Sequence, residues 1–123
     1  MHTAFHSTIA RLGALIATTV LAATTALAAF PDRPIHLIVP FSPGGGTDSI
    51  ARSVGVGMSQ ALGQSVIIDN KPGAGTIIGD DYVAKSQPDG YTLVVATFAH
   101  AVNPSLMPRL PFDTDKAFAP VIL

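Results

Sequence analysis

The chain has 123 residues, a formal net charge of −1 and no cysteine. This charge balance gives no basic surface for nucleic acid, and the lack of cysteine excludes disulfides, thiol catalysis and thiolate metal sites. An anion site in this chain would have to be built locally, mainly from backbone N–H groups, because no long-range attraction would gather anions.

Residues 1–28 have the pattern of a cleavable secretory signal. Arg11 precedes an uncharged apolar run over residues 12–27, and the small residues Ala26 and Ala28 precede the expected cleavage point. The run is short for a membrane-spanning helix and is rich in Ala and Thr, so export with cleavage is favoured over a membrane anchor. We therefore predict an exported chain whose folded part, residues 29–123, forms one small domain.

The first glycine-rich turn follows a short apolar run and precedes a helix pattern. Residues 35–39 (IHLIV) predict a buried strand, and apolar residues recur at helical spacing over residues 48–62. Three consecutive glycines between them permit positive φ and close approach of a ligand to the backbone. Because the first turn of a helix leaves N–H groups unpaired, the junction suits an anion. The glycines are equally consistent with a tight turn that binds nothing.

The helix predicted over residues 48–62 carries one apolar stripe, which we expect to be buried. Gly63 is the predicted end of this helix. Gly55 and Gly57 weaken a helix interior, so we expect close packing against a sheet or an irregular middle turn. The stripe consists of Ile50, Ala51, Val54, Met58, Ala61 and Leu62.

A second unit repeats the pattern of strand, glycine-rich turn and helix. Residues 65–69 (SVIID) are a nearly continuous apolar run, as in strands of parallel sheets that are buried on both faces. A turn over residues 70–76 leads to a helix over residues 77–85, for which Thr76 is the predicted N-cap. The pair Asp80 and Asp81 is interpreted as solvated charge near the helix start rather than as a metal site.

The third unit is less regular. Residues 91–96 (YTLVVA) predict the third strand, and residues 97–102 lead towards a short helix that is expected to begin at Asn103, with Pro104 in its first turn. His100 lies after the third strand, where it is either a donor at a binding crevice or a partly buried loop residue.

The alternation of three strands with three helices predicts an α/β fold with an open parallel sheet and flanking helices. Its binding crevice would lie at the carboxyl ends of the strands, where the turns at residues 40–48, 70–76 and 97–103 meet. We expect Asp48 to cap its helix and face away from an anion. The hydroxyls of Ser42 and Thr47 and the backbone amides would then be the donors.

Two other chemistries fit the first turn less well. Asp69 ends the second strand at about the distance of a dinucleotide fingerprint, but the third glycine of that motif is missing and Pro43 stiffens the turn. Ser42 lies outside a G-x-S-x-G motif, which argues against nucleophilic hydrolysis. No cofactor and no metal are expected.

Four stretches resemble the substrate-binding receptors of tripartite tricarboxylate transporters, also called the Bug family. They are PDRPIHLIVPFSPGGGTDSIAR, LGQSVIIDNKPGAGTIIGDDYVAKSQPDGYTLVVAT, HAVNPSL and LPFDTDKAFAPV, which occur in this order between residues 31 and 121. The resemblance implies the first lobe of a periplasmic-binding-protein-like, or Venus flytrap, fold. It also implies a periplasmic receptor, not an enzyme, that captures a small carboxylate and delivers it to membrane permease subunits.

The resemblance implies that two turns hold a ligand carboxylate through backbone amides, hydroxyls and bridging waters, and that residues 97–103 border the cleft. Thr76 and Ile77 differ from the smaller or more polar residues common in the family, and Ile77 would narrow the cleft. The candidate ligand-binding residues are Phe41, Ser42, Gly44, Gly45, Gly46, Thr47 and Asp48 in the first turn, Gly73, Ala74, Gly75, Thr76 and Ile77 in the second, and Thr97 and His100.

Two further interpretations stay open. One is a ligand-sensing periplasmic domain that signals to a partner protein instead of feeding a transporter. The other is a fragment without function, because residues 110–123 end in an apolar run that resembles a strand or hinge cut in mid-course. Since members of the family continue into a second lobe, we expect residues 29–123 to be the N-terminal part of the first lobe, ending near the hinge crossover.

Overall fold

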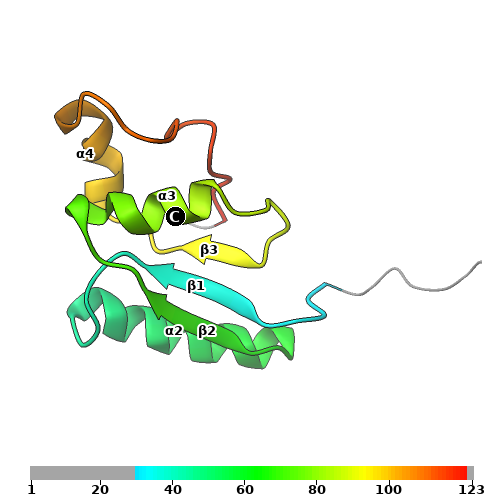
Figure 1. Cartoon of the computed structure of the whole chain (residues 1–123). Coiled ribbons are helices and arrows are strands. Elements are labelled where there is room, and N and C mark those ends of the chain that lie inside the picture. Colours follow the sequence, from blue (N-terminus) through cyan, green and yellow to red (C-terminus); the bar gives the residue numbers. More distant parts are fainter. Residues whose placement is uncertain (1–29, 122–123) are drawn as a thin grey trace, which may run out of the picture. The chain divides into compact units, whose positions relative to one another are not determined.

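The structure, a computed structural model, describes residues 30–121. Its elements follow the predicted alternation of strands and helices (Figure 1). The predicted signal over residues 1–28 and the last two residues of the apolar tail lie outside the described residues. The elements are β1 (Ile35–Val39), α2 (Gly46–Leu62), β2 (Val66–Asn70), the short 3₁₀ helix η1 (Ala74–Thr76), α3 (Ile77–Ala84), β3 (Thr92–Val94) and α4 (Phe98–Leu106).

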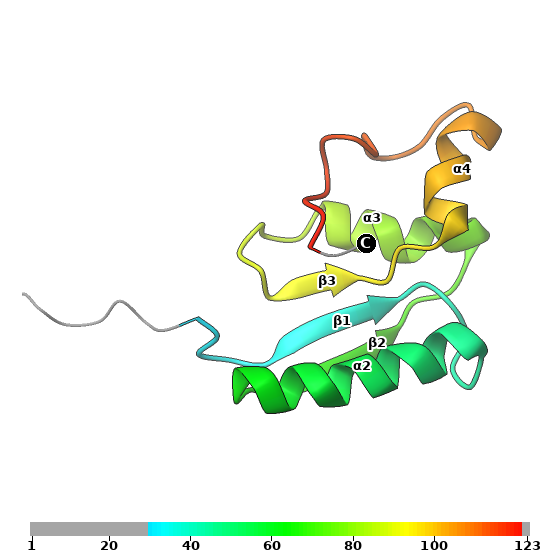
Figure 2. The ribbon, with the colours of Figure 1, turned by 180° about the vertical axis from the view of Figure 1, so that it is seen from behind.

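The three strands form one parallel sheet in the order β2-β1-β3. Val39 of the central strand pairs with Asn70 of β2, and Ile38 pairs with Val94 of β3. Helix α2 packs on β2 and β1. Helix α3 packs on β3 and β1 from the opposite face (Figures 1 and 2). The predicted α/β fold class is therefore confirmed, and the loops after all three strands emerge at the same edge of the sheet.

Small residues let α2 lie close to the sheet. Ala51 is buried, and a Cβ added to Gly55 would lie only 3.0 Å from Ile68 Cδ1. This confirms the close packing expected for Gly55, whereas Gly57 faces open space. The buried residues Leu37, Val39 and Ala51 form the core here, together with the partly buried Phe41, Val66, Ile68, Leu93 and Val95.

The predicted buried stripe of α2 is mostly exposed, so that prediction was wrong. Ile50 and Val54 are 65% and 50% exposed. The helix instead turns Asp48, Ala51 and Gly55 inward. The physical reason is that two small residues allow a close approach, while hydrogen bonds to Asp48 draw the start of the helix to the sheet.

The last helix also differs from its prediction. Helix α4 begins at Phe98 rather than Asn103, so Pro104 stands in its last turns instead of its first. Gly63 is confirmed as the end of α2, with a left-handed φ of 66° and its N–H donating to Ser59 O at 3.0 Å. Within residues 30–121, no helix combines the length and apolar character needed to cross a bilayer.

Candidate functional site

The two glycine-rich loops follow neighbouring strands and lie at the same carboxyl edge of the sheet. The first loop, residues 40–45, joins β1 to α2, and the second loop, residues 71–76, joins the neighbouring strand β2 to α3 (left side of Figure 1). Gly79, in the first turn of α3, packs against residues of both loops. A Cβ added there would lie 2.7 Å from Pro40 Cβ and 3.0 Å from the backbone oxygen of Lys71.

Asp48 fixes the shape of the first loop from within α2. It is 3% exposed, and its Oδ2 accepts hydrogen bonds from Gly44 N and Arg52 Nε, each at 2.9 Å. Its Oδ1 accepts a hydrogen bond from Asn70 Nδ2 at 2.9 Å, and the same Nδ2 donates to Phe41 O at 3.0 Å. The first loop is therefore tied to the end of β2 as well as to α2.

The predicted capping role of Asp48 was wrong in its detail. Gly45 is the N-cap of α2, and the helix has no side-chain cap. The Asp48 carboxylate reaches back to the amide of Gly44 in the loop instead. The hydrogen bonds from Arg52, Gly44 and Asn70, in that order of importance, hold the pKa of Asp48 well below its ordinary range. The carboxylate is therefore ionised near neutral pH and its charge is balanced by Arg52.

This lowered pKa predicts how stability depends on pH. The ionised Asp48 carboxylate stabilises the folded chain above its ordinary pKa of about 4, and that contribution is lost as the pH falls through the lowered value. We expect the wild-type chain to be more stable than Asp48→Asn by a constant margin above about pH 5 and by a shrinking margin in more acidic solution. Urea unfolding of both chains at each pH measures this margin. A margin that does not change with pH would contradict the expectation.

The second loop has a strained backbone. Gly73, Ala74, Gly75 and Thr76 all have positive φ values, of 133°, 48°, 63° and 85°. Such values suit glycine but are unusual for alanine and more so for a β-branched threonine. Each non-glycine residue held in this way costs about 1–3 kcal/mol, so the surrounding structure must hold the loop in place.

A buried polar cluster holds the second loop against α4. Thr76 Oγ1 donates to Asp80 Oδ2 at 2.9 Å, and Asn103 Nδ2 donates to Gly75 O at 2.8 Å and to Thr76 Oγ1 at 3.2 Å. His100 Nδ1 lies 3.3 Å from the same Asp80 oxygen. Thr76, Asp80 and Asn103 are each at most 6% exposed. Asp80 is thus buried, which corrects the interpretation of this residue as solvated charge.

The predicted donors of the first loop differ in what they can offer a ligand. Ser49 N donates to Gly45 O at 3.0 Å as the first bond of α2, so the amides of Gly46 and Thr47 precede the first intrahelical bond. The amide of Gly44 is already bonded to Asp48. Ser42, Gly45 and Gly46 are exposed, and Thr47 is half-buried.

Fewer backbone amides of the second loop are free to bind a ligand than was predicted. Thr76 N donates to Gly73 O at 3.1 Å, and Ile77 N donates to Ala74 O. Thr76 is the N-cap residue of α3, as predicted, but its hydroxyl bonds to Asp80 rather than to a backbone amide. The donors of this loop that remain as candidates are the amides of Gly73, Ala74 and Gly75.

The residues after β3 also lie at the carboxyl edge of the sheet. They begin α4, which packs against η1 in the second loop. Thr97 is the N-cap of α4 and accepts a hydrogen bond from His100 N at 3.0 Å. The His100 side chain is 18% exposed and packs edge-on against Phe118 at a centroid distance of 4.9 Å. His100 therefore contacts Asp80 and Phe118, as expected of a partly buried residue.

Sequence reasoning missed the side chains that shape both loops. Asn70 and Asn103 were not singled out, because their partners lie on other elements or in loop backbone. Arg52 was not singled out either, although its partner Asp48 lies four residues earlier on the same helix. The position of Asn70 offers one signal, since it ends the strand that leads into the second glycine-rich turn.

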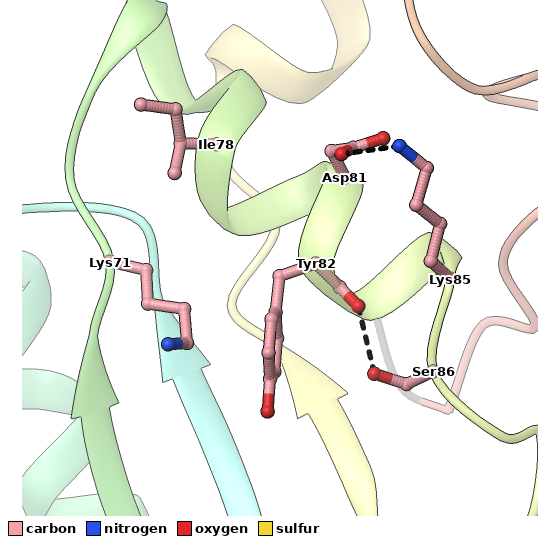
Figure 3. Close-up of a pocket in the computed structure, with 6 residues that line it drawn as sticks. All are labelled: Lys71, Ile78, Asp81, Tyr82, Lys85 and Ser86. Carbon is pink, nitrogen blue, oxygen red and sulfur yellow. Dashed lines mark hydrogen bonds and ion pairs between the residues drawn. The ribbon is translucent and has the colours of Figure 1, made fainter.

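A hollow of about 550 Å³ beside α3 lies apart from the candidate donors of the two loops (Figure 3). Lys71 Nζ lies 4.2 Å from the Tyr82 ring centroid, and Asp81 pairs with Lys85 at 2.7 Å. Asp81 Oδ1 is buried without a hydrogen-bond partner in the part of the chain that the structure describes, and the lining includes no residue of the first loop. Among the described residues, no cluster of three or more His, Cys, Asp or Glu side chains is placed to hold a metal. The hollow is lined by Lys71, Ile78, Asp81, Tyr82, Lys85 and Ser86.

Comparison with known proteins gives a consistent result. The sequence model of the tripartite tricarboxylate transporter family receptor matches residues 50–123. The chain is 44% identical to the protein BugT of Bordetella pertussis over 115 residues, which are 92% of this chain and 35% of BugT.

Two solved structures share both sequence and fold with the chain. The periplasmic binding protein BugD is 39% identical with a TM-score of 0.72, over 75% of this chain and 31% of BugD. MatC from Rhodopseudomonas palustris, solved with bound malate, is 41% identical with a TM-score of 0.71, over 75% of this chain and 32% of MatC. The chain spans about a third of the length of the curated relatives it matches.

Proposed function

The chain belongs to the tripartite tricarboxylate transporter receptor family, and on that basis we propose that it is a periplasmic receptor that captures a small carboxylate. The malate in the structure of MatC supports the ligand class. The ligand would be passed to membrane permease subunits. No catalytic step is part of the proposal.

The observation that carries this proposal is the position of two loops that each open a helix. The N-termini of α2 and α3 lie at the same edge of the sheet, and Gly79 in the first turn of α3 packs against Pro40 of the first loop. A helix N-terminus carries unpaired N–H groups and a partial positive charge, so two of them at one edge favour a carboxylate.

The first turns of α2 and α3 each carry a buried acidic residue. Asp48 is neutralised by Arg52 and hydrogen-bonded by Asn70. Asp80 is 1% exposed and accepts its hydrogen bond from Thr76. Because Asp48 is paired with Arg52, its carboxylate competes little with an anion at the start of α2.

We assign the ligand contacts to the amides of Gly45, Gly46 and Thr47 and the hydroxyls of Ser42 and Thr47 in the first loop. In the second loop the amides of Gly73, Ala74 and Gly75 take this role. The amides of Gly44, Thr76 and Ile77 are assigned to holding the loops in shape, because each already donates within the protein.

One amide of the first loop can be deleted with little disturbance. Gly46 is the first residue of α2, where proline is well tolerated, and the preceding Gly45 has the extended conformation that precedes proline. A Cβ at Gly46 meets nothing within 4 Å. Gly46→Pro therefore removes one N–H group, and Gly46→Ala is the matched control that keeps it.

The test is a titration of the ¹⁵N-labelled chain with L-malate, adipate and citrate, followed by NMR. We expect amide shifts at residues 45–47 and 73–75, and a Kd that is about tenfold or more weaker in Gly46→Pro but within about twofold of wild type in Gly46→Ala. A well-dispersed spectrum that none of the three acids changes would refute a carboxylate site. Equal Kd values for all three chains would instead refute the assigned role of the Gly46 amide.

A further inference from the structure

We propose that Asn103 and Asp80 are positioning residues that hold the second loop in its ligand-binding shape. The inference rests on the proposed function, because it concerns the same edge of the sheet. It goes further by giving α4 a part in binding, although neither side chain needs to touch the ligand.

The peptide group between Gly75 and Thr76 is held from α4. Asn103 Nδ2 donates to the carbonyl oxygen of Gly75 at 2.8 Å. A peptide group is planar, so holding the carbonyl of Gly75 also fixes the direction of the Thr76 N–H group. Asn103 is 6% exposed on α4 and therefore sets the orientation of this group from outside the loop.

The side chain of Thr76 is held by two hydrogen bonds. Its Oγ1 donates to Asp80 Oδ2 and accepts from Asn103 Nδ2. Asp80 belongs to the first turn of α3 and is 1% exposed, and its Oδ2 also lies 3.3 Å from His100 Nδ1. Thr76 is thus held from α3 and from α4 at once, which explains how a β-branched residue keeps a φ of 85°.

The backbone shape of the second loop determines how tightly it can bind a ligand. A loop with two non-glycine residues at positive φ would relax to ordinary backbone angles if its supports were removed. The apparent Kd of a ligand rises in proportion as the binding-competent fraction of the protein falls. Asn103 and Asp80 therefore act on affinity by keeping the amides of Ala74 and Gly75 in place before a ligand arrives.

Two variants test the proposal from opposite sides of the cluster. Asn103→Leu removes the amide donor of α4 at similar volume, and Thr76→Val removes the hydroxyl that reaches Asp80 while keeping the β-branch. Ser105→Ala is the matched control, since this residue is an exposed polar residue on the same helix. The readouts are the HN–Hα couplings of Ala74 and Thr76 without ligand, and the Kd for L-malate.

In Asn103→Leu and in Thr76→Val we expect the couplings to move towards ordinary backbone values and the Kd for L-malate to rise about threefold to tenfold. The Ser105→Ala chain should match the wild type in both readouts. Couplings and Kd that stay at wild-type values in either folded variant would overturn the proposal, even if the variant were less stable. If no carboxylate binds the wild-type chain, the proposed function fails, and the couplings alone still decide whether the cluster sets the loop.

Discussion

Replacing Gly79 with alanine is expected to destabilise the chain by about 1–3 kcal/mol and to weaken carboxylate binding at the same time. The new Cβ would lie 2.7 Å from Pro40 Cβ, 3.1 Å from Pro40 Cα and 3.0 Å from Lys71 O. A proline ring and a backbone oxygen cannot rotate out of the way, so α3 must move away from the first loop. Binding suffers because the two helix N-termini would then be farther apart.

Urea unfolding and the malate titration measure the two effects of Gly79→Ala. Gly57→Ala is the matched control, because it makes the same change inside α2 where an added Cβ meets nothing within 4 Å. Its expected effect has the opposite sign, a gain of about 0.5–1 kcal/mol, since alanine favours a helix interior over glycine. A Gly79→Ala chain as stable as the wild type would mean that the two loops are not packed as described.

Ile38→Ala is expected to have the largest effect on stability, a loss of about 2–5 kcal/mol. Ile38 lies in the central strand and is completely buried. It alternates with Leu37 and Val39, so it points to the face of the sheet on which α3 packs. Small domains have unfolding free energies as low as about 5 kcal/mol, so this one substitution removes a large share of the total.

Circular dichroism during urea unfolding measures this loss. Ile50→Ala deletes the same atoms from a side chain that is 65% exposed, and its unfolding free energy should lie within about 0.5 kcal/mol of wild type. Ile38→Val should cost only about 0.5–1.5 kcal/mol. If Ile38→Ala and Ile50→Ala proved equally harmless, the packing of α3 on β1 would have to be different from the one described.

The element order was predictable because it depends on short-range patterns. The apolar run of residues 35–39 became β1 with the predicted bounds, and the glycine-rich turns at residues 40–48 and 70–76 became the loops before α2 and α3. The alternation of strands with helices was sufficient to predict a parallel sheet, because two strands that are joined through a helix normally run in the same direction in one sheet.

The buried face of α2 and the burial of Asp80 were not predictable in this way. Asp48 is held by Asn70, which is 22 residues away, and Asp80 lies against His100, which is 20 residues away. A prediction from helical periodicity uses only the polarity and spacing of residues along the helix. It therefore cannot show that a polar residue will be buried against a partner on another element. An apolar stripe was therefore predicted to be buried where the fold buries an aspartate and a glycine.

The candidate site was predicted both as loops at one edge of the sheet and as a set of donors, namely the hydroxyls of Ser42 and Thr47 and the backbone amides. Glycine content and the helix start indicated where free amides should lie, and the structure brings both loops together. The amides of Gly44, Thr76 and Ile77 are bonded within the protein, which depends on backbone angles that the sequence does not reveal. The role of these loops in holding a carboxylate stays a prediction.

The exposed apolar face of α2 formed by Ile50 and Val54 has a consequence for how copies of the chain behave in solution. These side chains are 65% and 50% exposed, while the net charge of the chain is only −1. Two copies near neutral pH therefore repel each other weakly, and contact between their apolar faces is favourable. Added salt would screen what repulsion remains and strengthen the apolar attraction, so self-association should grow with ionic strength rather than diminish.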